Sequence, residues 1–176
     1  GIRTNEGNPE SRIGGRMLKA IIISDSHGDL KNVRKIAEKE HNIDLVIHLG
    51  DLLGQDEQLA EIFNCEIKKV KGNCDYYSNN PVSDVVEFGG NRIFITHGHN
   101  YGVDFGLDGL SYAAVENSCP IALCGHTHVP DSSIRGKIII VNPGSVSRPR
   151  QLGGRPTYGV MKVNGEGKAD IRIEYV

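Results

Sequence analysis

The chain of 176 residues contains 20 lysines and arginines and 22 aspartates and glutamates, for a formal net charge of -2, and 38% of its residues are hydrophobic. This length is typical of one domain that buries roughly 70% of its unfolded surface, and the near-neutral charge gives no overall attraction to nucleic acid or to an anionic membrane. No apolar run approaches the roughly 20 residues of a membrane-spanning helix. The four cysteines form no CxxC pair and follow no secretory signal, so a reducing cytoplasm is the expected location.

Residues 1–16, GIRTNEGNPESRIGGR, hold only Ile2 and Ile13 as sizeable apolar side chains. Such a segment cannot bury enough apolar surface to offset the entropy lost on ordering. We expect a disordered leader, or a remnant of expression or of a mis-assigned start, since Met17 stands directly before the first strand-like run. Residues 17–176 are expected to form a single domain.

From Met17 onward, short β-rich apolar runs alternate with helical stretches, a pattern typical of an α/β sheet. The expected strands are 18–24, 43–49, 66–71, 85–88, 92–96, a short run at Ile121, 137–141, 158–163 and 169–175. The expected helices are 30–40, 57–63 and 106–116. The Gly89-Gly90-Asn91 turn predicts a hairpin. The last three strands, which no helix separates, are expected to pair antiparallel.

Polar side chains able to bind metal fall just past the carboxyl ends of consecutive expected strands. This set is Asp25, His27, Asp51, Asn73, His97, His99, His126 and His128. In open α/β sheets, ligands bind in the crevice outside these strand ends, so we expect the set to converge there. In the stretch "CGHTH" at 124–128, the two imidazoles would then each bind one of two neighbouring metal ions. Ligands from other segments of the chain would complete both sites.

The residue types predict a site for two divalent ions. Asp25 and His27 are one residue apart, so in extended backbone both side chains project to the same side. Asp51 follows Gly50, which permits the close approach of a bridging carboxylate. Imidazoles and carboxylates without thiolate suit manganese, iron, zinc, cobalt or nickel. The positive charge of two dications exceeds the negative charge of two carboxylates, so the centre would keep a net positive charge and attract a phosphate.

Each motif alone has a simpler interpretation, since an HxH pair is weak evidence for metal and "SDSHGD" also fits a helix N-cap. Five such motifs in order, each ending an apolar strand, favour metal binding. His48, inside the second expected strand, is expected to pack or to support the site rather than to bind metal. His99 stays open between a substrate contact and a supporting role.

The motifs "SDSHGD", "IHLGD", "VKGNCD", "THGH", "CGHTH" and "VNPGS" resemble the calcineurin-like metallophosphoesterase superfamily. Within it they resemble the small bacterial and archaeal phosphodiesterases of the YfcE and MJ0936 type, over Met17 to about Arg150 and beyond. The resemblance implies an α/β fold, a four-layer α/β/β/α sandwich with two mixed β-sheets. It also implies one ion held by Asp25, His27, Asp51 and His128, and a second held by Asp51, Asn73, His97 and His126. Manganese is the expected metal, with zinc, iron, cobalt and nickel as alternatives.

The implied activity is a dinuclear metal-dependent phosphodiesterase that hydrolyses small phosphodiesters by a metal-bridging hydroxide. We assign catalytic roles to Asp51, Asn73 and His99, and we expect Cys74 and Arg148 to contact the substrate. Cys74 stands where the superfamily usually has a histidine that assists the leaving group, and a thiol is a weaker hydrogen-bond donor. Its simpler interpretation is a small apolar residue at the edge of the site, and that of Arg148 is a surface residue.

Two other functions stay open. One is a phosphomonoesterase or nucleotidase of the same fold, which pocket shape and leaving-group assistance alone would distinguish. The other is a non-catalytic protein-binding scaffold of the VPS29 type, which predicts a missing metal ligand, whereas every ligand position is filled here. The expected partner is a small phosphoester. No nucleic-acid polymer and no membrane is expected, and a homo-oligomer is left open.

Overall fold

A computed structural model describes residues 17–176, and the expected leader, residues 1–16, lies outside the described residues. The strands of the described part are β1 (Leu18–Ile23), β2 (Leu45–His48), β3 (Glu66–Lys69), β4 (Ser83–Phe88), β5 (Asn91–Thr96), β6 (Ile121–Leu123), β7 (Asp131–Arg135), β8 (Ile138–Asn142), β9 (Thr157–Val163) and β10 (Ala169–Tyr175). Its helices are α1 (Lys31–Lys39), α2 (Asp56–Ile62), α3 (Asp108–Glu116) and a short 3-10 helix, η1 (His99–Tyr101). None of these described helices has the length and apolar composition needed to cross a membrane.

The strands form two mixed five-stranded sheets. The first has the order β10-β9-β1-β2-β3, in which β1, β2 and β3 are parallel and β9 runs antiparallel to both of its neighbours. The second has the order β4-β5-β6-β8-β7, in which β5, β6 and β8 are parallel and the two edge strands are antiparallel to them. Each sheet therefore contains three neighbouring parallel strands, whose carboxyl ends lie at one edge.

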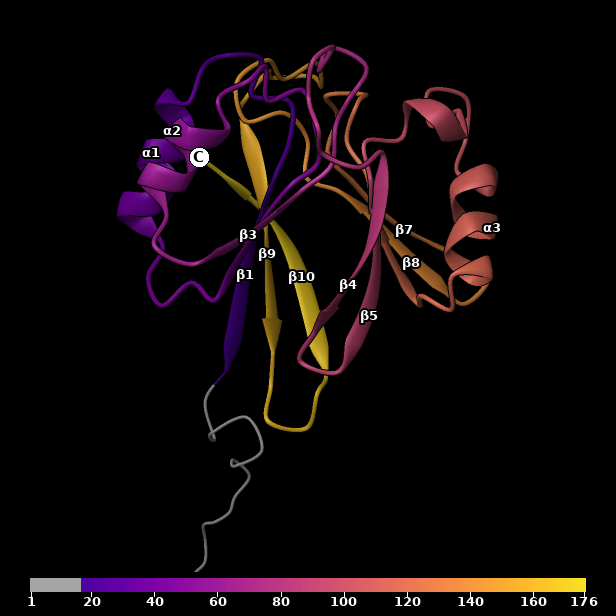
Figure 1. The fold of residues 1–176 in the computed structure, drawn as a ribbon. Helices are drawn as coiled ribbons and strands as arrows, with labels where there is room; N and C mark the ends of the chain where they lie inside the picture. The colour runs from indigo at the N-terminus through magenta and orange to yellow at the C-terminus, as the bar shows by residue number, and fades with distance from the viewer. Residues whose placement is uncertain (1–16) are drawn as a thin grey trace, which may run out of the picture.

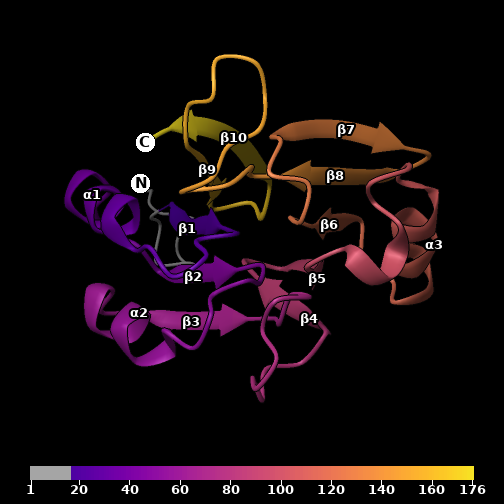
Figure 2. The same ribbon diagram turned by 90° about the horizontal axis from the view of Figure 1, so that it is seen from above.

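The two sheets pack face to face, with helices on both outer faces (Figures 1 and 2). Apolar side chains such as Ile22 of β1 and Leu123 of β6 meet in the core between the sheets. Helices α1 and α2 cover the outer face of the first sheet, where Val33 is buried, and α3 covers the second through Leu110. Three separate apolar cores thus hold four layers together. This confirms the expected α/β/β/α sandwich.

The expected strands and helices are all present, with boundaries shifted by one or two residues. The hairpin turns on Gly89 and Gly90, both with positive φ, which suits the tight connection of β4 to β5. Strands β9 and β10 pair antiparallel as expected, whereas β8 lies in the other sheet, antiparallel to β7 and parallel to β6. The sequence does not predict β7, because this edge strand is polar and mostly exposed and lacks apolar alternation.

Candidate metal centre

The carboxyl ends of parallel strands from both sheets deliver the expected ligands to one place. Asp25 and His27 follow β1, Asp51 follows β2 and Asn73 follows β3, all in the first sheet. His97 follows β5, and His126 and His128 follow β6, in the second sheet. The site therefore lies where the two sheets meet, and the expected convergence of these seven side chains is observed.

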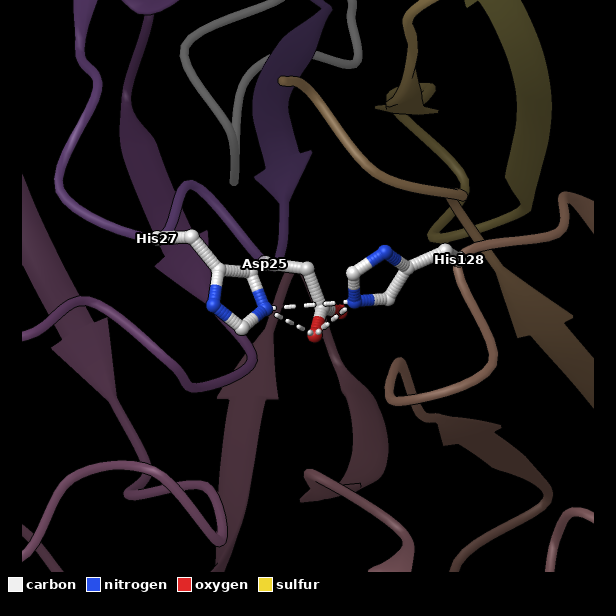
Figure 3. Close-up of side chains that lie close together, drawn as sticks. All are labelled: Asp25, His27 and His128. Atoms are coloured by element: carbon white, nitrogen blue, oxygen red, sulfur yellow. Dashed lines mark hydrogen bonds and ion pairs between the residues drawn. The ribbon is translucent and has the colours of Figure 1, made fainter. Parts of the chain in front are cut away.

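One group consists of Asp25, His27 and His128 (Figure 3). The Nε2 atoms of the two imidazoles lie 3.2 Å apart. Oδ1 of Asp25 lies 3.2 Å from Nε2 of His128 and 3.6 Å from Nε2 of His27. Three potential ligand atoms thus surround a single point.

A second group lies beside it, and Asp51 connects the two. Oδ2 of Asp51 lies 3.4 Å from Nε2 of His27 and 3.3 Å from Nε2 of His97. On the far side, Nδ1 of His126 lies 3.3 Å from Nε2 of His97 and 3.1 Å from Oδ1 of Asn73. Asp51 therefore stands between the two groups, as a bridging carboxylate would.

The outer nitrogens of three imidazoles are held by acceptors. Nδ1–H of His97 donates to the carbonyl of Leu49 at 2.7 Å, and Nδ1–H of His128 donates to the carbonyl of Arg148 at 2.7 Å. Nε2–H of His126 donates to Oδ2 of Asp104 at 2.9 Å. Carbonyl and carboxylate oxygens only accept, so these outer nitrogens carry the protons. In the neutral rings, the lone pairs of the inner nitrogens then point into the centre, the arrangement that metal-binding histidines use.

In each of the two carboxylates, one oxygen accepts hydrogen bonds from the protein and the other faces the centre. Oδ2 of Asp25 accepts hydrogen bonds from the Ser24 hydroxyl and the backbone N–H of His126, whereas its Oδ1 is buried and has no hydrogen-bond partner. Oδ1 of Asp51 accepts the backbone N–H of Cys74 at 2.9 Å, and its Oδ2 faces the imidazoles. A buried carboxylate oxygen without a donor fits a cation, and hard oxygen and imidazole donors together suit a divalent transition metal.

Opposite effects set the charge states of this cluster. Burial works to raise the pKa of Asp25, but the neighbouring imidazoles of His128 and His27 outweigh it and hold that pKa far below its usual value. Burial works to lower the pKa of His97, but the carboxylates of Asp51 and Asp25 outweigh it and raise that pKa. Burial also works to raise the pKa of Asp51, but His97 and the backbone N–H of Cys74 outweigh it and lower that pKa. Asp25 and Asp51 are therefore ionised, and the cluster attracts positive charge.

The backbone at these positions differs from the expected extended conformation. Five of the ligand candidates have positive φ: Asp25 (57°), His27 (49°), Asp51 (60°), His126 (74°) and His128 (63°). Aspartate and histidine are among the residue types that occur more often in this left-handed region. The expectation that Asp25 and His27 share a side through extended backbone is wrong, because both residues have left-handed backbone and the turn from Ser26 to Asp29 follows β1.

A close approach is observed at Gly50, but its partner is His97 rather than the expected bridging carboxylate of Asp51, which lies against Gly72 instead. A Cβ atom at Gly50 would lie 2.6 Å from Nδ1 of His97, and one at Gly72 would collide with the carboxylate of Asp51. Both positions exclude any side chain because the backbone of one loop packs directly against the ligands of another.

Several residues that support the site are not predicted by the sequence. Asp75, buried next to Cys74, accepts the backbone N–H groups of Asp51 and Gly72 at 2.7 Å and of Leu53 at 2.8 Å. Its carboxylate thus ties the loop after β2 to the loop after β3. The "GNCD" motif contains this aspartate, which is the one signal that points to it.

The "NPGS" motif supports the other side of the site. The Ser145 hydroxyl donates to the carbonyl of Asp25 at 2.8 Å, and the side-chain amide of Asn142 donates to the carbonyl of Gly125 at 3.0 Å. His48 is fully buried, accepts the backbone N–H of Gly50 on Nδ1 and contacts the Ser26 hydroxyl, while burial lowers its pKa to about 4. It supports the turns, as expected, and lies outside the ligand groups.

Besides Asp51 and Asn73, three residues are expected to assist catalysis or to contact the substrate. Sγ of Cys74 lies within 4.8 Å of ligand atoms of His27 and Asp51, and burial together with the Asp51 carboxylate raises the pKa of this thiol. The His99 ring centroid is 5.4 Å from that of His97, and its Nδ1 is buried without a hydrogen-bond partner. The Arg148 residue is exposed, and its backbone carbonyl, as described above, holds His128.

Comparisons with known proteins agree with this geometry. The family model for the calcineurin-like phosphoesterase superfamily domain matches residues 18–166. The probable metallophosphoesterase YsnB of Bacillus subtilis is 36% identical over 136 residues, which cover 76% of this chain and 78% of YsnB. The phosphodiesterase YfcE of Escherichia coli is 30% identical over 171 residues, which cover 82% of this chain and 88% of YfcE.

Solved structures show the same fold. A predicted phosphoesterase from Streptococcus pneumoniae has a TM-score of 0.73 and 32% identity, covering 92% of this chain and 99% of that one. Vacuolar protein sorting 29 from Cryptosporidium parvum has a TM-score of 0.73 at 20% identity, covering 91% of this chain and 98% of that one, a likeness of fold alone. The chain therefore belongs to the calcineurin-like phosphoesterase superfamily, in its branch of small phosphodiesterases, and is a metal-dependent hydrolase acting on phosphoester bonds.

Proposed function

We propose that this chain is a dinuclear phosphodiesterase that hydrolyses small phosphodiesters. The observation that carries the proposal is the orientation of the ligand atoms. Inner nitrogens of His97, His126 and His128 and inner oxygens of Asp25 and Asp51 face one centre, while their outer atoms are hydrogen-bonded to the protein. Such preorganisation is costly unless cations bind there.

In this proposal, Asp25, His27 and His128 would hold one ion, Asn73, His97 and His126 would hold the other, and Asp51 would bridge them. When bound, two divalent ions would supply a positive centre for the phosphate and would lower the pKa of a bridging water, so that hydroxide would be available as the nucleophile at neutral pH. Manganese is the first choice of metal, and the same ligands suit zinc, iron, cobalt and nickel.

The remaining residues act on the substrate. His99, at the edge of the second group, is placed to donate to a phosphate oxygen, and the exposed guanidinium of Arg148 is available to bind a second one. Cys74 lies next to both groups, and a thiol is a weaker hydrogen-bond donor than an imidazolium, with little power to protonate a leaving group. Weak proton donation at this position supports a preference for diesters with good leaving groups. A monoesterase or nucleotidase would need stronger proton donation to the leaving group.

A protein-binding scaffold of the VPS29 type is the second candidate, and the similarity in fold alone supports it. It has less support than the enzyme because all seven expected ligand positions are filled and face one centre. We further propose a small phosphoester rather than a nucleic-acid polymer or a membrane as the partner. We propose the cytoplasm as the location, since the four cysteines are all free, as in a reducing compartment.

The replacement Asp51→Asn tests the bridge. It preserves the size of the side chain but removes the negative charge shared by the two groups, so kcat/KM for bis(p-nitrophenyl) phosphate should fall to the background of the metal-free protein. The matched control is Asp170→Asn, on the exposed face of β10, which should leave the rate unchanged. Full activity in Asp51→Asn, or in wild type after chelation, would contradict the metal mechanism.

Replacement of Asp104 tests the carboxylate that orients His126. Because Asp104 holds the outer nitrogen of that ring at 2.9 Å, Asp104→Ala should weaken manganese binding by about 10- to 100-fold. Asp104→Asn keeps an acceptor oxygen, so it should reduce the manganese affinity less than Asp104→Ala does. Calorimetric titration with manganese measures both, and the melting temperature of the metal-free protein should stay within about 2 °C because the aspartate is half exposed. Manganese affinity within twofold of wild type in Asp104→Ala would remove this role.

Replacement of Cys74 tests its part in catalysis. If the thiol occupies the position without reacting, Cys74→Ala should reduce kcat/KM by less than about tenfold. Cys74→His should raise activity most for poor leaving groups, where proton donation is commonly worth about 10²- to 10⁴-fold. The neighbouring Asp75 carboxylate already accepts three backbone N–H groups.

The measurement for position 74 is kcat/KM across phosphodiesters whose leaving groups span a range of pKa. A large loss in Cys74→Ala for every substrate, with no gain in Cys74→His, would show that the thiol itself takes part in the reaction.

A further inference from the structure

A pocket of about 480 Å³ opens beside the metal centre. Its walls come from the loop after β2, including Leu53, and from the loop after β3, which contributes Cys74, Tyr76, Tyr77 and Asn79. Cys74 belongs both to this pocket and to the group formed with His27 and Asp51, whose ligand atoms lie within 4.8 Å of its sulfur. The volume lies in the range of small-molecule sites, roughly 300–1,000 Å³. A substituent on a phosphate held at the centre can therefore extend into the pocket.

The loop that forms this pocket is held in place by its own hydrogen bonds. The Asp75 carboxylate anchors its start, and the backbone N–H of Ser78 donates to the carbonyl of Asp75 at 3.3 Å. The backbone N–H of Asn80 donates to the Ser78 hydroxyl at 3.0 Å, and Lys71 N–H donates to the carbonyl of Pro81 at 2.8 Å. The backbone of this pocket wall is thus fixed before a ligand binds, which lowers the entropy lost on binding.

Two aromatic side chains of this loop face solvent. Tyr76 is 80% exposed and Tyr77 is 99% exposed, although the backbone that carries them is hydrogen-bonded, and Leu53 across the pocket is 41% exposed. Large apolar side chains exposed beside a reaction centre are typical of binding sites. Aromatic rings bind flat partners by stacking, whatever the identity of the ring.

The charges of the pocket exclude an ionic ligand group. Among the described residues, no lysine or arginine lines it. Its two carboxylates are already paired, Asp56 with Lys69 at 2.9 Å and with the Asn80 amide at 3.0 Å, and Asp75 with backbone N–H groups. The pocket therefore offers no cationic side chain to a second phosphate, and each of its carboxylates is already engaged with a donor of the protein. The exposed side-chain amide of Asn79 supplies a donor and an acceptor for a polar ring edge.

We propose that this pocket binds a flat, uncharged aromatic substituent of the phosphoester, of the class to which nucleobases and simple aryl groups belong. The proposal rests on the proposed function, because the metal centre must hold the phosphate from which the substituent extends. Tyr76 and Tyr77 stack on the ring, and the pocket selects among diesters by the shape of their organic group.

Three phosphonates test this without hydrolysis, since their carbon–phosphorus bond is not cleaved: methylphosphonate, phenylphosphonate and cyclohexylphosphonate. Calorimetric titration into manganese-loaded protein should give a Kd for phenylphosphonate about tenfold below that of methylphosphonate, as expected for one stacked ring. Cyclohexylphosphonate is similar in size to phenylphosphonate but not flat, so its Kd should be at most threefold below that of methylphosphonate. The double variant Tyr76→Ala/Tyr77→Ala should remove the phenyl advantage and leave the Kd of methylphosphonate within twofold.

Tyr112→Ala, an exposed tyrosine on α3, is the matched control and should change none of the three Kd values. Equal affinities for the phenyl and methyl compounds in wild type, or a phenyl advantage that survives the double variant, would overturn the pocket assignment while leaving the phosphate site intact. Failure of all three phosphonates to bind the loaded protein would instead contradict the proposed function, and with it this inference.

Discussion

Two carboxylates, Asp25 and Asp51, are buried beside each other, and the rest of the structure makes that arrangement stable. Asp25 is fully buried and Asp51 is 2% exposed, and each acid opposes the ionisation of the other. Burial of a charge is unfavourable unless it is hydrogen-bonded and paired. Backbone N–H groups satisfy the outer oxygens, imidazoles face the inner ones, and one inner oxygen is left without a donor. A divalent cation bound at this point would complete the electrostatic balance.

The turns after the strands are where the chain accepts strain to build this centre. A left-handed conformation costs roughly 1–3 kcal/mol for residues other than glycine, and it persists where the surroundings enforce it. Contacts with two distant segments hold Asp25 in this left-handed conformation. Its backbone carbonyl accepts a hydrogen bond from the Ser145 hydroxyl, and its carboxylate accepts one from the backbone N–H of His126. The residue types that the chemistry needs, aspartate and histidine, are also among those that tolerate this backbone best.

The layers of the fold and the convergence of the polar residues could be predicted because their signals are local. An apolar run followed by a metal-capable side chain is visible within a few residues, and parallel strands then place such ends together. Asp104 could not be found this way, since it lies 22 residues from His126 and no local pattern connects them. Ser145 lies 120 residues from Asp25, and the backbone turns that replaced the expected extended conformation depend on such distant contacts.

The anomalous scattering of manganese in crystals of the metal-loaded protein tests the dinuclear centre most directly. Two peaks about 3.5–4 Å apart are expected, with the carboxylate of Asp51 between them. Asp25, His27 and His128 should lie around one peak and Asn73, His97 and His126 around the other. A single peak, or peaks that do not contact Asp51, would contradict the dinuclear centre.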